Sequence, residues 1–148
     1  MGRVSTDPHA TADPREVLGY LLKHATARLA ALTDEALEPL GIDGKDFGAL
    51  RVLAHREPTS QLEVAQTLGI DRTTMVALLD VLERKGIVTR RPDPRDRRRN
   101  VVELTEHGIQ TFDAAEAAHA KAESAFLAGV SPSAAAQLRR TLRTLVDG

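Results

Sequence analysis

Apolar residues recur at helical spacing near the start of the chain. Between Pro14 and about Pro39 they form one wide stripe of Val17, Leu18, Leu21, Leu22, Ala25, Leu29, Leu32, Ala36 and Leu40. Spacings of three and four residues predict one long amphipathic helix, and a proline suits its first turn because that position needs no N–H donor. The stripe is wider than one small core requires. We therefore expect the helix to pack against a partner as well as its own domain; packing on its own core alone is the alternative.

Two short helices are expected after the break at Pro39-Leu40-Gly41. The first opens at Asp43 and ends near Glu57-Pro58. Its apolar residues are Phe47, Leu50, Val52, Leu53 and Ala54. The second spans Gln61–Leu68 behind a cap, either Thr59 or Ser60. It is expected to bury Leu62, Ala65 and Leu68 and to end at Gly69.

A fourth helix follows this glycine turn directly. Asp71 can cap it by accepting a hydrogen bond from the N–H of Thr73 or Thr74. Its apolar stripe has the spacing of one helix face and consists of Met75, Leu78, Leu79 and Leu82. The helix is expected to stop at Lys85-Gly86, which leaves two helices joined by a tight turn.

The rest of the chain combines a small β-hairpin with two more helices. Ile87–Arg91 and Asn100–Leu104 have β-type composition, and Pro92–Arg99 joins them as a long tip. A fifth helix follows, to about Leu127, and a sixth begins at Ser131-Pro132. The sixth carries apolar residues on one face, namely Leu138, Leu142, Leu145 and Val146. The fold class predicted is mainly α with a small β-hairpin.

Composition narrows the class of protein. The 148 residues are 42% apolar and 28% charged, as in ordinary globular domains. The absence of cysteine excludes a disulfide scaffold, a cysteine-ligated zinc finger and a thiol sensor. No stretch approaches a membrane span and Met1–Pro14 lacks the apolar core of a signal peptide, so we expect a cytoplasmic protein that does not bind membranes. Without a glycine-rich phosphate loop, a serine elbow or a histidine-rich motif, we expect neither an enzyme nor a cofactor.

Charge is concentrated in one part of the chain. Arg84–Arg99, the basic segment, holds eight cations against Asp93 and Asp96, a net charge of +6. Because the whole chain carries −1, the remainder carries −7. A basic patch on an acidic body indicates a surface for a polyanion. The alternative is a solvated loop that its charges keep soluble.

The two helices on either side of Gly69 are arranged as in a helix-turn-helix. In that motif the second helix lies in the major groove of DNA, where its N-terminal residues reach base edges. The residues that lie off the buried stripe there are Arg72, Thr73, Thr74, Val76 and Ala77. An arginine can pair with guanine, threonines with phosphates or bases, and small apolar side chains with a thymine methyl. The alternative is a pair of packed helices that binds no nucleic acid.

The hairpin tip favours the DNA-binding interpretation. Arg95, Arg97, Arg98 and Arg99 suit a narrow minor groove, which attracts arginine. Asp96 would repel phosphate if it were free, so we expect it to brace a neighbouring arginine. A helical dimerisation module whose tip binds an acidic protein is the alternative. The aromatic content of 3% argues against RNA, whose recognition relies on stacking.

Four stretches resemble the MarR-type winged helix-turn-helix regulators. They are Leu68–Met75, Leu82–Val88, Arg90–Asn100 and Val102–Gly108. The most specific part is the Asp-Pro-x-Asp-x-Arg wing followed by Leu-Thr-x-x-Gly. The resemblance implies a homodimer in which the first, fifth and sixth helices interlock. It also implies a transcriptional regulator, most often a repressor, whose recognition helices and wings meet a pseudo-palindromic operator in double-stranded DNA.

The resemblance further implies a division of the chain. Residues 1–13 would be a flexible tail, and 14–148 would be a single winged helix-turn-helix domain of the MarR type. Within it, 14–40 and 105–148 would supply the dimerisation helices. The lobe between them, 43–104, would bind DNA.

The resemblance also assigns the family's DNA-contacting positions to residues of this sequence. The wing arginine that enters the minor groove falls on Arg98, with Asp96 as its brace. The base-facing positions fall on the five residues of the fourth helix named above. Ala77 departs from the family pattern, in which a longer polar or basic residue is common. The operator sequence therefore stays open.

Many members of the family release DNA when a small phenolic or anionic molecule binds. Tyr20, His24 and Arg28 lie one above another on the first predicted helix, at a spacing of four residues. Such a column can line a pocket and hold an anionic effector. The alternative is that it forms the solvated edge of a long helix.

A metal site is a further hypothesis. Glu116, His119 and Glu123 share one face of the fifth predicted helix, and Glu-x-x-His is a ligand spacing of helical metal sites. One helix cannot close a metal site alone, and such triplets are common on surfaces. Whether these residues bind a metal stays open.

Overall fold

The fold is mainly α with a small antiparallel sheet, as predicted. The computed structural model describes residues 13–55 and 57–148. Its elements in chain order are η1 (Pro14–Glu16), α1 (Leu18–Leu37), η2 (Glu38–Leu40), α2 (Gly44–Ala54), β1 (Thr59–Ser60), α3 (Gln61–Leu68), α4 (Arg72–Arg84), β2 (Val88–Pro92), β3 (Asn100–Leu104), α5 (Glu106–Phe126) and α6 (Pro132–Asp147). The expected tail lies outside the described residues, except for Asp13, which caps η1.

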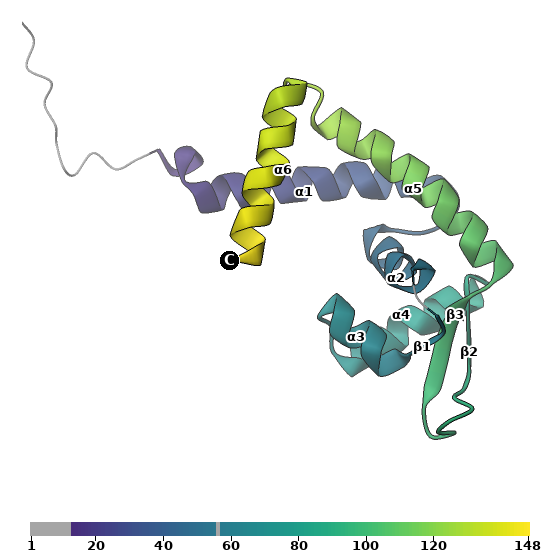
Figure 1. The fold of residues 1–148 in the computed structure, drawn as a ribbon. Helices are drawn as coiled ribbons and strands as arrows, with labels where there is room; N and C mark the ends of the chain where they lie inside the picture. Colours follow the sequence, from purple (N-terminus) through teal and green to yellow (C-terminus); the bar gives the residue numbers. More distant parts are fainter. Residues whose placement is uncertain (1–12, 56) are drawn as a thin grey trace, which may run out of the picture.

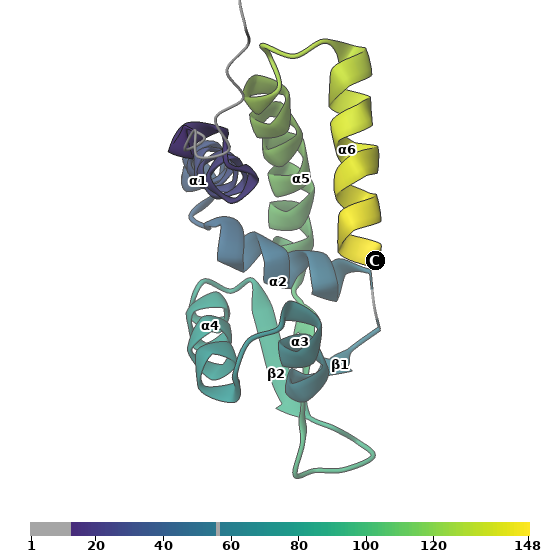
Figure 2. The same ribbon diagram turned by 90° about the vertical axis from the view of Figure 1, so that its left-hand side faces the viewer.

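The helices divide into two layers. The long helices α1 and α5 pack against each other, and Figure 2 shows α5 between α1 and α6. Below them lie α2, α3, α4 and the sheet, and the β2–β3 hairpin points away from the long helices (Figure 1). In the described ranges, no helix is both long enough and apolar enough to cross a bilayer.

Local capping explains where the helices of the lower layer begin. Asp43 and Asp46 form a capping box at α2, in which each carboxylate accepts the other residue's backbone N–H. Of the two caps expected for α3, Ser60 is the one observed, and Asp71 caps α4 as predicted. Their apolar faces meet in one core, whose fully buried large side chains are Leu37, Leu50, Val64, Met75, Leu79, Leu82, Ile87, Val88 and Val102.

Two expectations for the lower layer are wrong. Helix α2 ends at Ala54, with His55 as its C-cap, rather than near Glu57-Pro58. Pro58 restricts only the residue directly before it, so it limits how far the helix can extend without fixing where it ends. Leu62 is 58% exposed rather than buried. The buried side of α3 is formed by Val64 and Ala65, and about 100° of rotation per residue places Leu62 beyond its edge.

The sheet has one more strand than the hairpin predicts. Its order is β1-β3-β2, with every pair antiparallel. Strand β1 pairs Thr59 with Val102, and β2 pairs Arg90 with the same residue from the other side. A two-residue strand that includes a helix cap has no alternating pattern, which is why the sequence does not predict it. The buried Val102 fastens the base of the hairpin to the core.

Candidate nucleic-acid interface

The N-terminus of α4 is held by its cap. The Asp71 carboxylate accepts hydrogen bonds from the Thr74 backbone N–H (2.8 Å) and from the Thr74 hydroxyl (2.7 Å). The backbone bond, followed by the hydroxyl bond, holds the pKa of Asp71 below its ordinary value. The preceding turn is closed by Gly69 in the left-handed region (φ 66°), where a side chain would be strained. The turn and cap therefore fix how α4 leaves α3.

The predicted base-reading residues lie on the outer face of α4. Arg72, Thr73, Thr74 and Ala77 are exposed and Val76 is half-buried. The opposite face buries Met75, Leu79 and Leu82. The helix thus combines one face packed in the core with one that presents a cation, two hydroxyls and small apolar groups.

The hairpin tip is ordered by backbone bonds to its own aspartates. The Asp96 carboxylate accepts the Arg98 backbone N–H (3.1 Å) and lies 3.7 Å from Nε of Arg98 and 3.8 Å from Nε of Arg99. Asp93 accepts the Arg95 N–H (2.9 Å). The Arg98 side chain is 95% exposed. Asp96 therefore lies where the expected brace of Arg98 requires it.

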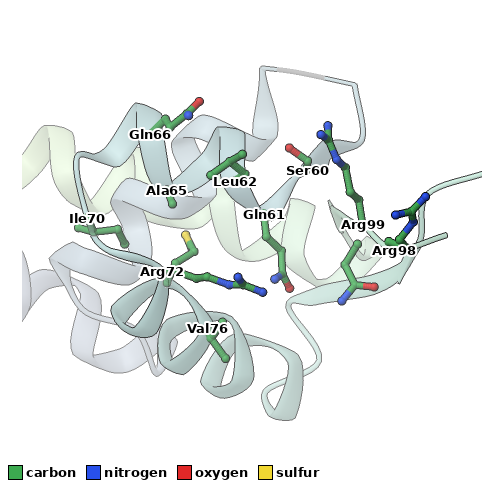
Figure 3. A pocket seen from close by; sticks show the side chains of 12 residues that line it. Ser60, Gln61, Leu62, Ala65, Gln66, Ile70, Arg72, Val76, Arg98 and Arg99 are labelled. Atoms are coloured by element: carbon green, nitrogen blue, oxygen red, sulfur yellow. The ribbon is translucent and has the colours of Figure 1, made fainter. Parts of the chain in front are cut away.

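A hollow of about 340 Å³ lies between α3, α4 and the hairpin tip (Figure 3). Arg72 lines it from α4, and Arg98 and Arg99 line it from the tip. Its apolar lining includes Met75 and Val76. The fold thus brings together cations that the sequence analysis assigned to two separate elements.

The same hollow contains a residue that the sequence analysis missed. Gln61, the first residue of α3, lines it next to the residues of α4. Its Oε1 is buried and lacks a hydrogen-bond partner among the described residues. Buried acceptors are ordinarily paired, so Gln61 is a further candidate for contact with a bound molecule. Its position before an apolar helix face gave no sign of this role.

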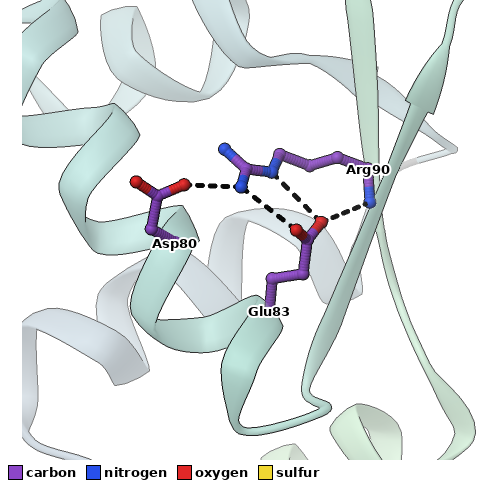
Figure 4. Close-up of polar contacts among 3 residues, drawn as sticks. All are labelled: Asp80, Glu83 and Arg90. Atoms are coloured by element: carbon purple, nitrogen blue, oxygen red, sulfur yellow. Dashed lines mark hydrogen bonds and ion pairs between the residues drawn. The ribbon is translucent and has the colours of Figure 1, made fainter.

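The base of the hairpin uses its arginines differently from the tip. Arg90 turns toward α4 and is bound by Glu83 and Asp80, as Figure 4 shows. Its hydrogen bonds lower the pKa of Glu83. Arg91 pairs with Glu103 across the hairpin at 3.0 Å. The charge of the basic segment is therefore partly compensated at the base, whereas Arg95, Arg97, Arg98 and Arg99 are exposed at the tip.

The candidate effector column lies on the surface of α1. Tyr20, His24 and Arg28 are all exposed in the described chain. The rings of Tyr20 and His24 stack with their centroids 4.0 Å apart and their planes 37° apart. The column thus presents an aromatic pair followed by a cation along one helix edge.

The candidate metal ligands are bound by arginines. Glu116 accepts a hydrogen bond from Arg51 on α2 (2.8 Å), and Glu123 accepts one from Arg139 on α6 (2.8 Å). His119 lies 4.0 Å from Glu123 and stacks on Phe47. Within residues 13–55 and 57–148, no three histidine or acidic side chains are grouped to hold a metal ion. These residues link helices in this structure.

Comparisons with known proteins identify the family. Residues 40–99 match the model of the MarR family. Over 102 residues the chain is 32% identical to the HTH-type transcriptional repressor NicR of Pseudomonas putida. The aligned region covers 69% of this chain and 65% of NicR. The alignment therefore spans less than two thirds of NicR.

Solved structures match over nearly the whole described chain. A MarR-family transcriptional regulator from Rhodococcus sp. RHA1 is 30% identical with a TM-score of 0.78, over 88% of this chain and 95% of that one. The repressor CouR bound to a 23-mer DNA duplex is 32% identical with a TM-score of 0.83, over 88% and 93%. CouR from Rhodococcus jostii RHA1 bound to p-coumaroyl-CoA is 27% identical with a TM-score of 0.75, over 88% and 91%. By its motifs, its fold and these relatives, the chain belongs to the MarR family of transcriptional regulators.

Proposed function

We propose that this chain is a homodimeric repressor that binds double-stranded DNA by sequence in the cytoplasm. The observation that carries the proposal is the hollow that Arg72 of α4 lines together with Arg98 and Arg99 of the hairpin tip. A helix N-terminus for the major groove and an arginine tip for the minor groove thus lie on one face. From here on α4 is called the recognition helix and residues 88–104 the wing.

Support also comes from a relative. CouR, 32% identical to this chain, has been solved on a 23-mer DNA duplex. If this chain docks in the same manner, the exposed side chains of Arg72, Thr73 and Thr74 face base edges and phosphates. Ala77, with Val76, then contributes methyl contacts rather than hydrogen bonds.

The dimer is proposed from two apolar faces. On α1, Leu18 is 63% exposed and Leu21 and Leu22 are exposed beside it. On α6, Leu145 is 64% exposed and Leu138 and Leu142 lie on the same face. No residue of α6 is buried in the described chain. Leucine stripes of this extent are typical of an interface, and a second copy supplies a matching pair of stripes.

A small phenolic or anionic effector is proposed to release the DNA. CouR has been solved with p-coumaroyl-CoA, a phenolic acyl group on an anionic carrier. The Tyr20–His24 stack and Arg28 offer an aromatic surface and a cation of the matching kind. Replacing Arg28 with Gln is expected to weaken release by an aromatic carboxylate and leave DNA affinity unchanged, as measured by anisotropy titration of a labelled operator. Equal release from both proteins would remove Arg28 from the effector site.

The proposed function is tested by selection from random duplexes. The purified full-length chain is expected to enrich an inverted repeat whose half-sites lie about one helical turn apart. Repeating the selection with excess nonspecific competitor DNA distinguishes a protein that recognises a DNA sequence from a basic surface that binds any duplex. If no motif emerges and binding is lost to the competitor, the tip binds an acidic protein or polyanion in general, and the proposal is wrong.

A further inference from the structure

We propose that Glu83 and Asp80 are positioning residues that fix, through Arg90, the angle between the recognition helix and the wing. This inference rests on the proposed function and deepens it. It assigns to the three residues the geometry with which one protomer reaches two grooves at once. None of the three is proposed to touch a base.

Arg90 is held from several directions. Its Nε donates to Oε2 of Glu83 at 3.1 Å, and one Nη donates to Oε1 of the same carboxylate at 3.1 Å. That Nη also donates to the Asp80 carboxylate at 2.5 Å. The Arg90 backbone N–H donates to Glu83 at 3.2 Å. Side chain and backbone of β2 are thus fastened to the same helix face (Figure 4).

The network is more than a surface ion pair. A forked guanidinium–carboxylate pair restricts orientation as well as distance. The Arg90 side chain is 18% exposed, compared with 95% for Arg98 at the tip. An arginine enclosed in this way by two carboxylates of the same molecule is not available to phosphate. Its function is therefore within the protein.

We expect the fold to persist without this network. The start of the wing is already anchored by Ile87 and Val88, which are buried, and by the buried Val102 opposite Arg90. These contacts hold the strands to the core. Arg90 lies on the same face of the sheet as Val88 and Val102, and its network extends the attachment of β2 from the core to the recognition helix. Breaking the network is expected to free the angle of the wing while the core stays packed.

The position of the network makes the angle matter for DNA. Arg90 lies near the base of the wing, and the arginines proposed for the minor groove lie at its tip. A small rotation at the base therefore moves the tip further than it moves the base. Because the recognition helix is fixed in the major groove, such a movement takes Arg98 out of register with its groove.

Replacing Glu83 with Gln separates positioning from charge. The substitution removes one negative charge beside the DNA-binding face, so electrostatics alone predicts tighter binding to every duplex. If Glu83 instead positions the wing, its loss is expected to weaken binding to the operator. The ratio of operator affinity to random-duplex affinity is expected to fall about tenfold, the order of one lost base-specific contact.

Glu103 provides the matched control. Its pair with Arg91 has nearly the same length, 3.0 Å, and Glu103→Gln removes the same negative charge. That pair joins β2 to β3 within the wing and does not reach the recognition helix. The control is expected to keep the affinity ratio of the wild type. A fall of equal size in both variants would overturn the proposal, since charge would then explain it.

A modified operator reports on the wing alone. Diaminopurine in place of adenine adds an amino group in the minor groove and leaves the major-groove edge as it was. Placed under the wing, it is expected to weaken binding of the wild type and of Glu103→Gln. Glu83→Gln is expected to respond much less. An unchanged response in Glu83→Gln would overturn the proposal.

A measurement without DNA completes the test. The chain has no cysteine, so Ala77→Cys and Arg97→Cys place two spin labels on the recognition helix and the wing tip. Labelled protein is mixed with excess unlabelled protein, so that each pair of labels is isolated in its dimer. Adding Glu83→Gln is expected to broaden the label distances, and adding Glu103→Gln to leave them unchanged.

The two proposals can fail separately. If the wild type prefers no duplex, the proposed function is wrong, and the label distances still decide whether Glu83 fixes the wing. If the wild type reads an operator but Glu83→Gln keeps both its affinity ratio and its label distances, the positioning role is wrong and the proposed function stands.

Discussion

Arginines of the basic segment lie in opposite environments. Arg90 is enclosed by two carboxylates of the recognition helix, whereas Arg98 extends into solvent from a tip that Asp96 orders. The N–H groups of an enclosed guanidinium donate hydrogen bonds within the protein. Those of an exposed guanidinium remain available to a ligand. We therefore propose that Arg90 serves structure and Arg98 serves binding, although they lie close together in one charged run.

The exposed arginine gives the first prediction. Arg98→Ala is expected to weaken binding to the selected operator by about tenfold or more, because one groove contact per protomer is lost. Thermal stability and oligomeric state are expected to stay as in the wild type, since the side chain packs against little. Anisotropy titration with a labelled duplex measures the change. Unaltered operator affinity would show that the wing arginine does not enter a groove.

The cap of the recognition helix gives a prediction about pH. Hydrogen bonds from Thr74 lower the pKa of Asp71 in the folded state. A carboxylate with a lowered folded pKa contributes stability above its unfolded pKa and loses it as the pH falls through the folded pKa. Asp71→Asn, which keeps the cap shape, is therefore expected to show a smaller drop in melting temperature on acidification than the wild type. Parallel melting curves in thermal scans would contradict this.

At the scale of elements, the junction between the wing and α5 leaves little room. The Thr105 hydroxyl donates to the carbonyl of Gly86, and the Thr105 N–H donates to that of Ile87 at 3.0 Å. A Cβ on Gly108 would overlap the Ile87 carbonyl oxygen. The start of α5 thus packs against the backbone that leads into β2. This contact couples the helix to the base of the wing.

Gly108→Ala tests that junction. The methyl group must displace backbone on one side or the other, so a loss of about 1–3 kcal/mol in the free energy of unfolding is expected. Gly129→Ala is the control, because a Cβ there meets no described atom within 4 Å. Chemical denaturation of both variants measures the difference. If both variants had the same free energy of unfolding, the backbone at the junction would accommodate the methyl group without destabilising the fold.

Much of the element order follows from local chemistry in the sequence. Asp71 and Ser60 cap helices as expected, since a side-chain oxygen at that position satisfies a free N–H. Strand β1 and the exposure of Leu62 do not follow. The first depends on pairing with β3, far along the chain, and the second on which side of α3 the core lies. Both features depend on tertiary contacts, which the spacing of apolar residues along the chain does not reveal.

The candidate site was predictable to a similar extent. The cations at the tip and on the recognition helix could be named from motifs, because the resemblance to the family places them at matching positions. Their meeting at one hollow, with Gln61 beside them, could not be named. Nor could the inward turn of Arg90, since a charge count does not show which carboxylates will face an arginine.

At the scale of the molecule, apolar surface remains uncovered on the long helices. Leu142 lies at the centre of the leucine stripe of α6, and Leu18 and Leu22 lie on the stripe of α1. A dimer would cover this surface and set the distance between two recognition helices. That distance decides which spacing of half-sites an operator needs.

Leu142→Glu is therefore expected to shift the protein from dimer to monomer, because the interface would have to bury a charge without a partner. Operator binding is expected to fall with it, since each monomer reads one half-site. Sedimentation velocity measures the oligomeric state. Leu62→Glu, at an exposed apolar residue of α3 outside the dimerisation helices, is the control for oligomeric state and is expected to stay dimeric. A dimeric Leu142→Glu protein would place the interface elsewhere.

The central claim is that this chain reads DNA sequence rather than DNA charge. The most direct measurement is its affinity for the selected duplex and for a scrambled duplex of equal composition, over a series of salt concentrations. Both affinities are expected to fall with salt, with a slope of about −0.9 for each phosphate neutralised. At physiological salt the selected duplex is expected to bind at least about a thousandfold more tightly. Equal affinities at every salt concentration would contradict the claim and leave a basic surface without sequence preference.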